Sequence, residues 1–473
     1  MARGSIITFM SRRNFILLII IFIIIGIAFF GFLYLQPKTT GPEGDNTGTN
    51  FISQFNPFAN NKPTAPATTT PPTDITGDQP AQTPAINAKL KKISSVPVAG
   101  FTVFSKERLK EVVVSPLLGG GVGEGSSQAD SSTSPLVPPQ KGGKKSSVTK
   151  PAAPLTEFMP ALRYVDRATG NIYQTFADKI EEKKFSTTII PMVYEAIFGN
   201  KGQSVVMRYL KADARTIITF VGALPKEVLG ADTAVGNEIK GTFLPEDTKD
   251  ISLSGDANSV FYLFNSGDSA VGTTLNLSTN KKVQVFSSPF TEWLSSFPNN
   301  KMITFTTKPS FGIPGYMYAL DPNNKNYNFN KILGNINGLT TLASPSVKLV
   351  LYSNDYLALN IYHSDTKVSD ALGIKTLSEK CVWNKTSDAV YCAVPKSIPV
   401  GQYPDSWYQG EVSFSDQIWK IDIKTGNATM VADPADIVGG EDIDGIKLAL
   451  DDGENYLFFV NKKDSFLWEL GLK

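Results

Sequence analysis

The stretch SGDANSVFYLFNSGDSAVGTTLNLSTNKKVQVF (Ser254–Phe286) shows the pattern that governs the C-terminal part of the chain. A turn rich in Ser, Asp and Gly precedes a short apolar run with aromatic residues. Further short runs follow, separated by Gly, Asn and Lys. Short β-branched and aromatic runs bounded by such turn residues predict β-strands joined by tight turns.

The same unit recurs throughout residues 158–473, which contain no amphipathic helical window of useful length. The clearest further copies are Ser296–Leu333, Ser344–Asp365 and Asp451–Leu470, with a fourth split between Asn384–Pro395 and Asp416–Asp433, and looser copies at Ala161–Phe176 and Gly199–Phe220. Their turns begin roughly 40 to 55 residues apart, which is typical of one four-stranded β-propeller blade.

Seven such units over 316 residues average about 45 residues each. We therefore predict an all-β, seven-bladed β-propeller over 158–473; six or eight blades also suit the spacing, and two stacked β-sandwiches are the alternative. The last copy ends at Leu470 without a fourth strand. An N-terminal strand commonly completes the last blade, and we expect residues 95–115 to supply it, through Val98–Phe104 or Glu111–Ser115.

Two strand-turn units, SPSVKLVLYS (Ser344–Ser353) and DDGENYLFFV (Asp451–Val460), carry a family resemblance. They resemble the extracytoplasmic propeller repeats of the TolB type and the propeller domains beside prolyl-oligopeptidase-like hydrolases. The resemblance covers the 316-residue repeat region with short, degenerate motifs. It implies a fold and leaves the function open.

Residues Phe15–Leu35 read FILLIIIFIIIGIAFFGFLYL, an uncharged apolar run. A helix of this length spans a bilayer's hydrocarbon core of roughly 30 Å. Arg3, Arg12 and Arg13 precede it, so the positive-inside bias places residues 1–14 in the cytoplasm and the rest outside the cell membrane. A cleaved signal peptide is the competing interpretation, but the run is long for one and no A-x-A-like cleavage site follows. We expect a single-pass signal anchor.

Two segments have the composition of linkers. Residues 36–94 contain nine prolines and eleven threonines, and residues 116–157 are rich in Gly, Ser, Pro and Lys. Such sequences cannot bury enough apolar surface to offset their ordering entropy. We predict a disordered tether at 36–94 and a low-complexity loop at 116–157.

Composition excludes several function classes. The chain has 45 Lys and Arg against 44 Asp and Glu, so it lacks the basic field that sequence-independent nucleic-acid binding requires. Its one histidine, His363, rules out multi-histidine metal sites. We find no nucleophile elbow, zinc-protease motif or phosphate-binding loop. The sequence therefore predicts no catalytic residues, no metal and no cofactor.

Cys381 and Cys392 lie in KCVWNKTSDAVYCA, which reads as two strands around a turn. If Asn384 pairs with Ala389, the two cysteines face each other across the hairpin, within reach of a disulfide. An extracytoplasmic compartment would maintain that bond. We predict a disulfide, with two separate buried thiols as the alternative.

The insertion PKSIPVGQYPDSWYQGEVSF (Pro395–Phe414) breaks the repeat. Aromatic rings with nearby amide and carboxylate groups suit peptide anchoring or sugar stacking. The candidate binding residues are Tyr403, Asp405, Trp407, Tyr408 and Gln409. The alternative is that the aromatic rings fold back and pack against the blade.

Two functions follow from this organisation. The first is a membrane-anchored, extracytoplasmic binding or scaffold module for an envelope protein, a peptide or a glycan. The alternative is an envelope glycan hydrolase that uses paired carboxylates at the propeller channel. Carboxylates near turns, such as Asp355, Asp405, Asp416 and Asp442, are the candidates for that chemistry, although turn Asp residues commonly cap backbone amides.

Overall fold

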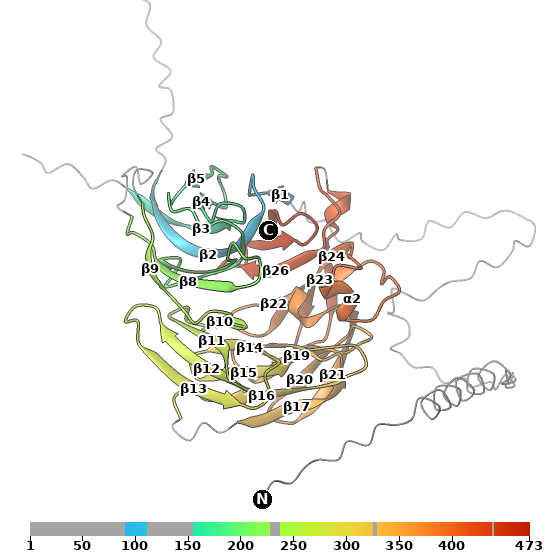
Figure 1. Cartoon of the computed structure of the whole chain (residues 1–473). Coiled ribbons are helices and arrows are strands. Elements are labelled where there is room, and N and C mark those ends of the chain that lie inside the picture. The colour runs from blue at the N-terminus through green and yellow to red at the C-terminus, as the bar shows by residue number, and fades with distance from the viewer. Residues whose placement is uncertain (1–89, 111–154, 228–236, 325–328, 438) are drawn as a thin grey trace, which may run out of the picture. The chain divides into compact units, whose positions relative to one another are not determined.

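The computed structural model describes residues 90–110, 155–227, 237–324, 329–437 and 439–473. Within these residues the chain forms seven four-stranded antiparallel sheets (Figure 1). In six of them the strands follow one another in sequence order, as hairpin connections produce. This is the arrangement that the repeated strand-turn units predict.

The sheets contain the following strands. Blade 1 contains β2 (Val98–Leu109), β3 (Thr156–Asp166), β4 (Ile172–Phe176) and β5 (Lys183–Lys184); blade 2 contains β6 (Val193–Gly199), β7 (Ser204–Leu210), β8 (Ile217–Ala223) and β9 (Lys240–Phe243); blade 3 contains β10 (Asp250–Leu253), β11 (Ser259–Ser266), β12 (Ser269–Asn276) and β13 (Lys282–Ser288). Blade 4 contains β14 (Trp293–Asn299), β15 (Met302–Thr307), β16 (Pro314–Leu320) and β17 (Asn330–Asn337); blade 5 contains β18 (Thr340–Ala343), β19 (Leu349–Ser353), β20 (Ala358–His363) and β21 (Val368–Lys375). Blade 6 contains β22 (Cys381–Trp383), β23 (Ala389–Pro395), β24 (Asp416–Asp422) and β25 (Ala428–Ala432); blade 7 contains β26 (Gly445–Leu450), β27 (Tyr456–Asn461), β28 (Leu467–Gly471) and β1 (Leu90–Lys92).

The first strands of the blades form a closed ring of contacts. β2 touches β6, β6 touches β10, β10 touches β14 and β14 touches β18. β18 touches the short helix η2 (Ser378–Lys380), which leads directly into β22, and β22 touches β26, which returns to β2. Sheets arranged radially around a central axis in this way make a seven-bladed β-propeller. The predicted fold class and blade number are confirmed.

An N-terminal strand closes the ring, but it is not one of the predicted strands. Leu90–Lys92 (β1) pairs with β28 and completes blade 7. Val98–Phe104 belongs to β2, the first strand of blade 1, while Glu111–Ser115 lies outside the described residues. The sequence pattern does not reveal this strand, because it has only three residues, two of them are lysines, and only Leu90 is buried.

Apolar side chains are buried between neighbouring sheets. Phe286 of blade 3 stacks on Phe305 of blade 4 at 4.2 Å between ring centroids, and Trp293 meets Phe286 edge-on. Val98 and Tyr164 of blade 1 pack with Phe458 of blade 7. Because each blade buries both faces, its middle strands read as apolar runs and not as alternating ones.

The predicted disulfide is present between Cys381 and Cys392. The two residues are directly opposite each other in the β22–β23 ladder, and the Asn384 N–H donates to the Ala389 carbonyl as the hairpin register requires. The alternative of two free thiols is therefore wrong.

None of the helices among the described residues has the length and apolarity that a bilayer crossing requires. The predicted anchor at Phe15–Leu35 lies outside the described residues, as do residues 36–89 of the predicted tether and 116–154 of the predicted loop.

Candidate functional site

Strand direction gathers three connections on one face of the propeller. In an antiparallel blade, every connection from the second to the third strand leaves from the same edge. The three connections are residues 308–313 in blade 4, 354–357 in blade 5 and the long insertion 396–415 in blade 6. The sequence of the insertion is therefore presented beside two shorter loops.

The insertion folds over its own aromatic core. It contains one helical turn, α2 (Asp405–Tyr408), seen beside β23 and β24 in Figure 1. Tyr403 and Trp407 are buried, each stacked near Phe414, and they pack against Leu357 and Leu377 of the neighbouring blade. These two predicted binding residues therefore form part of the core of the insertion.

Asp405 and Gln409 have different surroundings. The Asp405 carboxylate accepts hydrogen bonds from the Ser310 hydroxyl and the Phe311 N–H, so it ties the insertion to the blade 4 loop. Gln409 is exposed, and its backbone N–H returns to the Asp405 carbonyl. Of the predicted site residues, Tyr408 and Gln409 are exposed, Asp405 is half-buried, and Tyr403 and Trp407 are buried.

Exposed apolar side chains collect on these three loops. Val400 is fully exposed, Tyr356 is 73% exposed, Ile313 is 59% exposed, Phe311 is 41% exposed and Tyr408 is 39% exposed. We call this set the insertion face. The sequence identified only Tyr408 among them. The other four are isolated apolar residues in loops far apart in sequence, and only the fold places them on one face.

An ionic cluster is buried beneath the insertion. Lys380, at the end of η2, has no exposed side-chain surface, and its Nζ lies 2.8 Å from Asp416 Oδ2. The same Nζ donates to Asp444 Oδ1, and both carboxylates are also fully buried. The rings of Trp407 and Phe414 lie 5.1 and 5.2 Å from this ammonium.

The second oxygen of Asp444 is held by three donors. Trp407 Nε1, Ser413 Oγ and the Phe414 N–H each donate to Asp444 Oδ2 at 3.0 Å. Burial opposes ionisation of Asp444, but the charge of Lys380 and these hydrogen bonds outweigh it and lower its pKa. Asp444 is therefore the ionised partner of Lys380.

Asp416 has the opposite electrostatic balance. Burial, with the neighbouring Asp444 charge adding to it, raises the pKa of Asp416 to about 6 despite the nearby Lys380. Its Oδ2 accepts from the Gly445 N–H at 2.7 Å, whereas Oδ1 has no hydrogen-bond partner in the described part of the chain. The two carboxylates therefore differ in proton affinity.

Glu379 and Lys462 extend the cluster toward the surface. Burial raises the pKa of Glu379, whose carboxyl hydrogen-bonds with the Tyr408 hydroxyl. Lys462 Nζ donates to the Trp407 carbonyl at 2.6 Å and lies over the Trp407 ring. Tyr408 thus exposes part of its ring while its hydroxyl is anchored below.

The cluster does not suit glycan hydrolysis. Its two carboxylates, Asp416 and Asp444, are fully buried around one ammonium, so no sugar reaches them. Two of the other acidic candidates bind local partners: Asp405 holds the blade 4 loop, and Asp442 pairs with Lys463. Neither arrangement presents two free carboxylates to a common space.

His363 lies away from this site. It ends β20, and its Nε2 is 3.1 Å from Asp370 Oδ2 on the adjacent strand β21. The connection that follows β20 leaves from the opposite face to the insertion. In the residues that the structure describes, no group of three or more His, Cys, Asp or Glu side chains is arranged to hold a metal ion.

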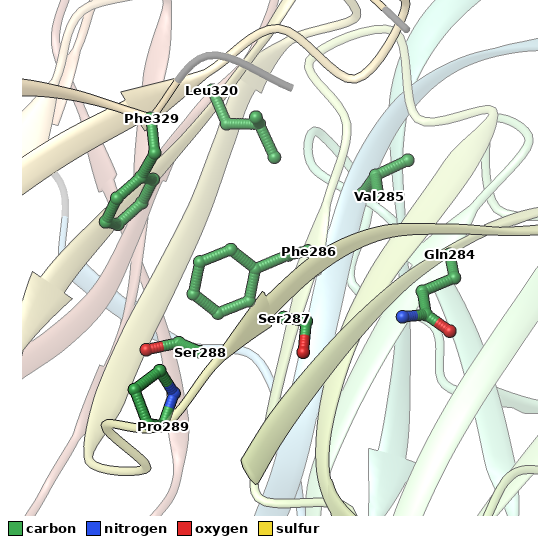
Figure 2. Close-up of a pocket in the computed structure, with 8 residues that line it drawn as sticks. All are labelled: Gln284, Val285, Phe286, Ser287, Ser288, Pro289, Leu320 and Phe329. Carbon is green, nitrogen blue, oxygen red and sulfur yellow. The ribbon is translucent and has the colours of Figure 1, made fainter. Parts of the chain in front are cut away.

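A cavity of about 410 Å³ lies between the outer part of blade 3 and blade 4. Figure 2 shows the rings of Phe286 and Phe329, with centroids 5.3 Å apart, beside Leu320 and Pro289. Its polar side chains are one amide and two serine hydroxyls, with no charged group. This apolar cavity has no acid or base for catalysis.

No protein-family model matches the chain, and no curated protein matches it. Among solved structures, it is similar to an oligogalacturonate lyase in complex with manganese, at 8% identity and a TM-score of 0.42, over 66% of this chain and 85% of that one. It is also similar to the oligogalacturonate lyase of Vibrio parahaemolyticus (8% identity, TM-score 0.43, 67% and 86% coverage). A third similarity is to Kuenenia stuttgartiensis hydrazine synthase (12% identity, TM-score 0.41, 59% and 76% coverage).

These similarities are too distant to carry any functional argument. The seven-bladed propeller rests on the strand pairing of this chain itself. At the level of the fold, the expected resemblance to propeller repeat proteins is confirmed.

Proposed function

We propose that this chain is a membrane-anchored, extracytoplasmic binding module that captures an envelope protein or peptide on the insertion face. The observation that supports this proposal is the presence of five exposed apolar side chains on three loops of one face, two of which the Asp405 carboxylate ties together. Exposed apolar patches on rigid scaffolds mark interaction sites.

The chemistry of the insertion face favours a protein partner over a glycan. Val400, Ile313 and Phe311 offer aliphatic and aromatic surface, and the Asp405 carboxylate at Phe311 already accepts hydrogen bonds from within the protein. Sugar recognition needs aromatic faces combined with a dense set of hydrogen-bond partners, whereas protein hot spots are built from buried apolar anchors. We therefore expect a partner that presents apolar side chains of its own.

The location is supported by two features. The uncharged run at Phe15–Leu35 is long enough to span a bilayer, and the preceding arginines orient it. The Cys381–Cys392 disulfide suits an oxidising compartment. Together they favour a tethered domain outside the cytoplasm.

The test begins with a photo-crosslinking residue in place of Gln409 in intact cells, followed by identification of the captured chain. Binding of that purified partner is then measured for the double variant Tyr356→Ser with Val400→Ser. Because two hot-spot anchors are lost, we expect the dissociation constant to rise at least about tenfold.

A control variant removes two exposed apolar side chains elsewhere. Val368 on β21 and Met430 on β25 are 52% and 47% exposed. The double variant Val368→Ser with Met430→Ser should bind as the unaltered protein does. Equal affinities for both double variants would reject the insertion face as the binding site.

A further inference from the structure

Three groups that can react with one another are buried together beneath the insertion. The primary amine of Lys380 contacts one carboxylate oxygen each of Asp416 and Asp444. All three side chains have zero exposure, so water does not separate them. An amine and a carboxyl group held in contact have a very high effective concentration.

The surroundings of these groups disfavour charge. A buried ammonium with two carboxylates loses the hydration of all three groups, and the mutual attraction of ions only partly offsets that cost. The faces of the Trp407 and Phe414 rings attract the Lys380 ammonium, but they also take the place of water that would hydrate it. Conversion of an ion pair to a neutral amide removes two buried charges.

The carbonyl carbon of Asp444 is prepared for attack. Oδ1 faces Lys380 Nζ, while Trp407 Nε1, Ser413 Oγ and the Phe414 N–H converge on Oδ2. Donors fixed on one oxygen stabilise the negative charge that develops there when a nucleophile adds to the carbon. The Asp444 backbone is also fixed, because its N–H donates to the Asn461 side chain.

Asp416 is placed to move protons. Its Oδ2 contacts the same Nζ, and its other oxygen has no partner among the described residues. Burial raises the pKa of Asp416 to about 6, which lies near the pH at which a general acid–base group works best.

We propose that Lys380 and Asp444 condense to an intramolecular isopeptide bond, with Asp416 as the catalytic proton relay. Asp416 first carries one proton from the Lys380 ammonium to Oδ1 of Asp444, which leaves a neutral amine and a neutral acid. Lys380 Nζ then adds to Cγ of Asp444, and the charge collects on Oδ2. Asp416 carries the second proton from Nζ to Oδ1, the Cγ–Oδ1 bond breaks and one water molecule leaves. The ammonium and carboxylate become an amide and water, without oxidation or reduction.

The bond would join two blades at the insertion. Lys380 immediately precedes β22 of blade 6, whereas Asp444 immediately precedes β26 of blade 7. The Cys381–Cys392 disulfide begins one residue after Lys380. Two covalent links would therefore fix the base of the insertion.

The test is peptide mapping of the purified full-length chain after reduction, alkylation and trypsin digestion. An amide on Lys380 blocks cleavage after that residue. The expected product is peptide 376–385 joined to peptide 425–447, lighter than their sum by one water molecule. A free peptide 376–380 together with an unmodified 425–447 would overturn the proposal and leave a buried ion pair.

Two variants assign the role of Asp416. Asp416→Asn keeps a similar shape but removes the proton relay, so the joined peptide should disappear. Asp442→Asn changes a nearby acid that pairs with Lys463 on the surface, and it should leave the joined peptide unchanged. A joined peptide of undiminished yield in Asp416→Asn would exclude the relay. Should that variant not fold, the map of the unaltered chain still decides whether the bond exists.

Discussion

At the residue scale, the pKa of Glu469 depends more on burial than on its pairing with a charged group. It lies on β28 opposite Lys91 of the closing strand, with 1% of its side chain exposed and the charged groups 3.9 Å apart. Burial raises the pKa of Glu469 from its ordinary value of 4.5 to about 7, although Lys91 acts in the other direction.

This shift gives a pH dependence with a defined sign. Between about pH 4.5 and about pH 7 the folded chain holds a proton on Glu469 that the unfolded chain has released, so the free energy of unfolding falls as pH rises. The contribution is present below the unfolded pKa and lost above the folded one. Asp250 and Asp416, whose pKa values burial raises to about 6, act in the same direction.

We predict that Glu469→Gln is more stable than the unaltered chain at about pH 8, by up to about 3 kcal/mol, because no charge is then buried. The difference should shrink toward about pH 5. Urea unfolding at both pH values measures it. Asp452→Asn, at a surface carboxylate that is 74% exposed, is the control and should change neither value. An identical pH profile for Glu469→Gln would contradict the assignment.

Single residues of the insertion show the limit of composition as a guide to function. The sequence drew attention to Tyr403 and Trp407 as aromatic binding residues, but both are buried in the insertion core. An aromatic side chain gains more free energy from burial than most residues, so a cluster of them suits a core as well as a surface. Only the packing distinguishes the two roles.

At the scale of elements, the three-residue strand β1 closes the ring. Leu90 is buried in the cluster that blade 7 shares with blade 6, and Ile93 in the cluster that it shares with blade 1. The Ile93 N–H donates to the Leu467 carbonyl. Without β1, the outer edge of β28 would be open to pairing with other chains.

We predict that a chain that begins at residue 94 is less stable than one that begins at residue 88 by about 3–6 kcal/mol. This is the burial free energy of two large aliphatic side chains. Thermal and urea unfolding of both truncated chains measure it, and light scattering reports aggregation through the open β28 edge. Coincident unfolding curves for the two chains would show that β1 contributes nothing to closure.

At the scale of the whole molecule, the proposed orientation of the chain across a membrane would decide which partners it can meet. We predict that a membrane-impermeant amine reagent labels the propeller in sealed right-side-out vesicles. Lys385, whose side chain is 81% exposed, is a suitable reporter. A cytoplasmic protein that reacts only after lysis serves as the control. Labelling of Lys385 that also required lysis would reverse the proposed orientation.

Much of the fold could be predicted from sequence because propeller blades are local. Each blade is a meander of neighbouring strands, so the apolar runs and turn residues report it directly. The pairing of Cys381 with Cys392 could be predicted for the same reason, since the two cysteines are eleven positions apart on one hairpin. The closing strand lay hundreds of residues from its partner and left almost no pattern.

The sequence by itself determined the repeat and its β character, and it predicted seven blades and the disulfide, because each depends on residues close together in the chain. Only the tertiary structure decided which strand closes the ring, which insertion side chains reach solvent, and that Lys380, Asp416 and Asp444 share one buried space. Lys380 and Asp444 are 64 residues apart and belong to different blades. Contacts of this kind arise from ring closure, which brings blade edges together whatever their separation along the chain.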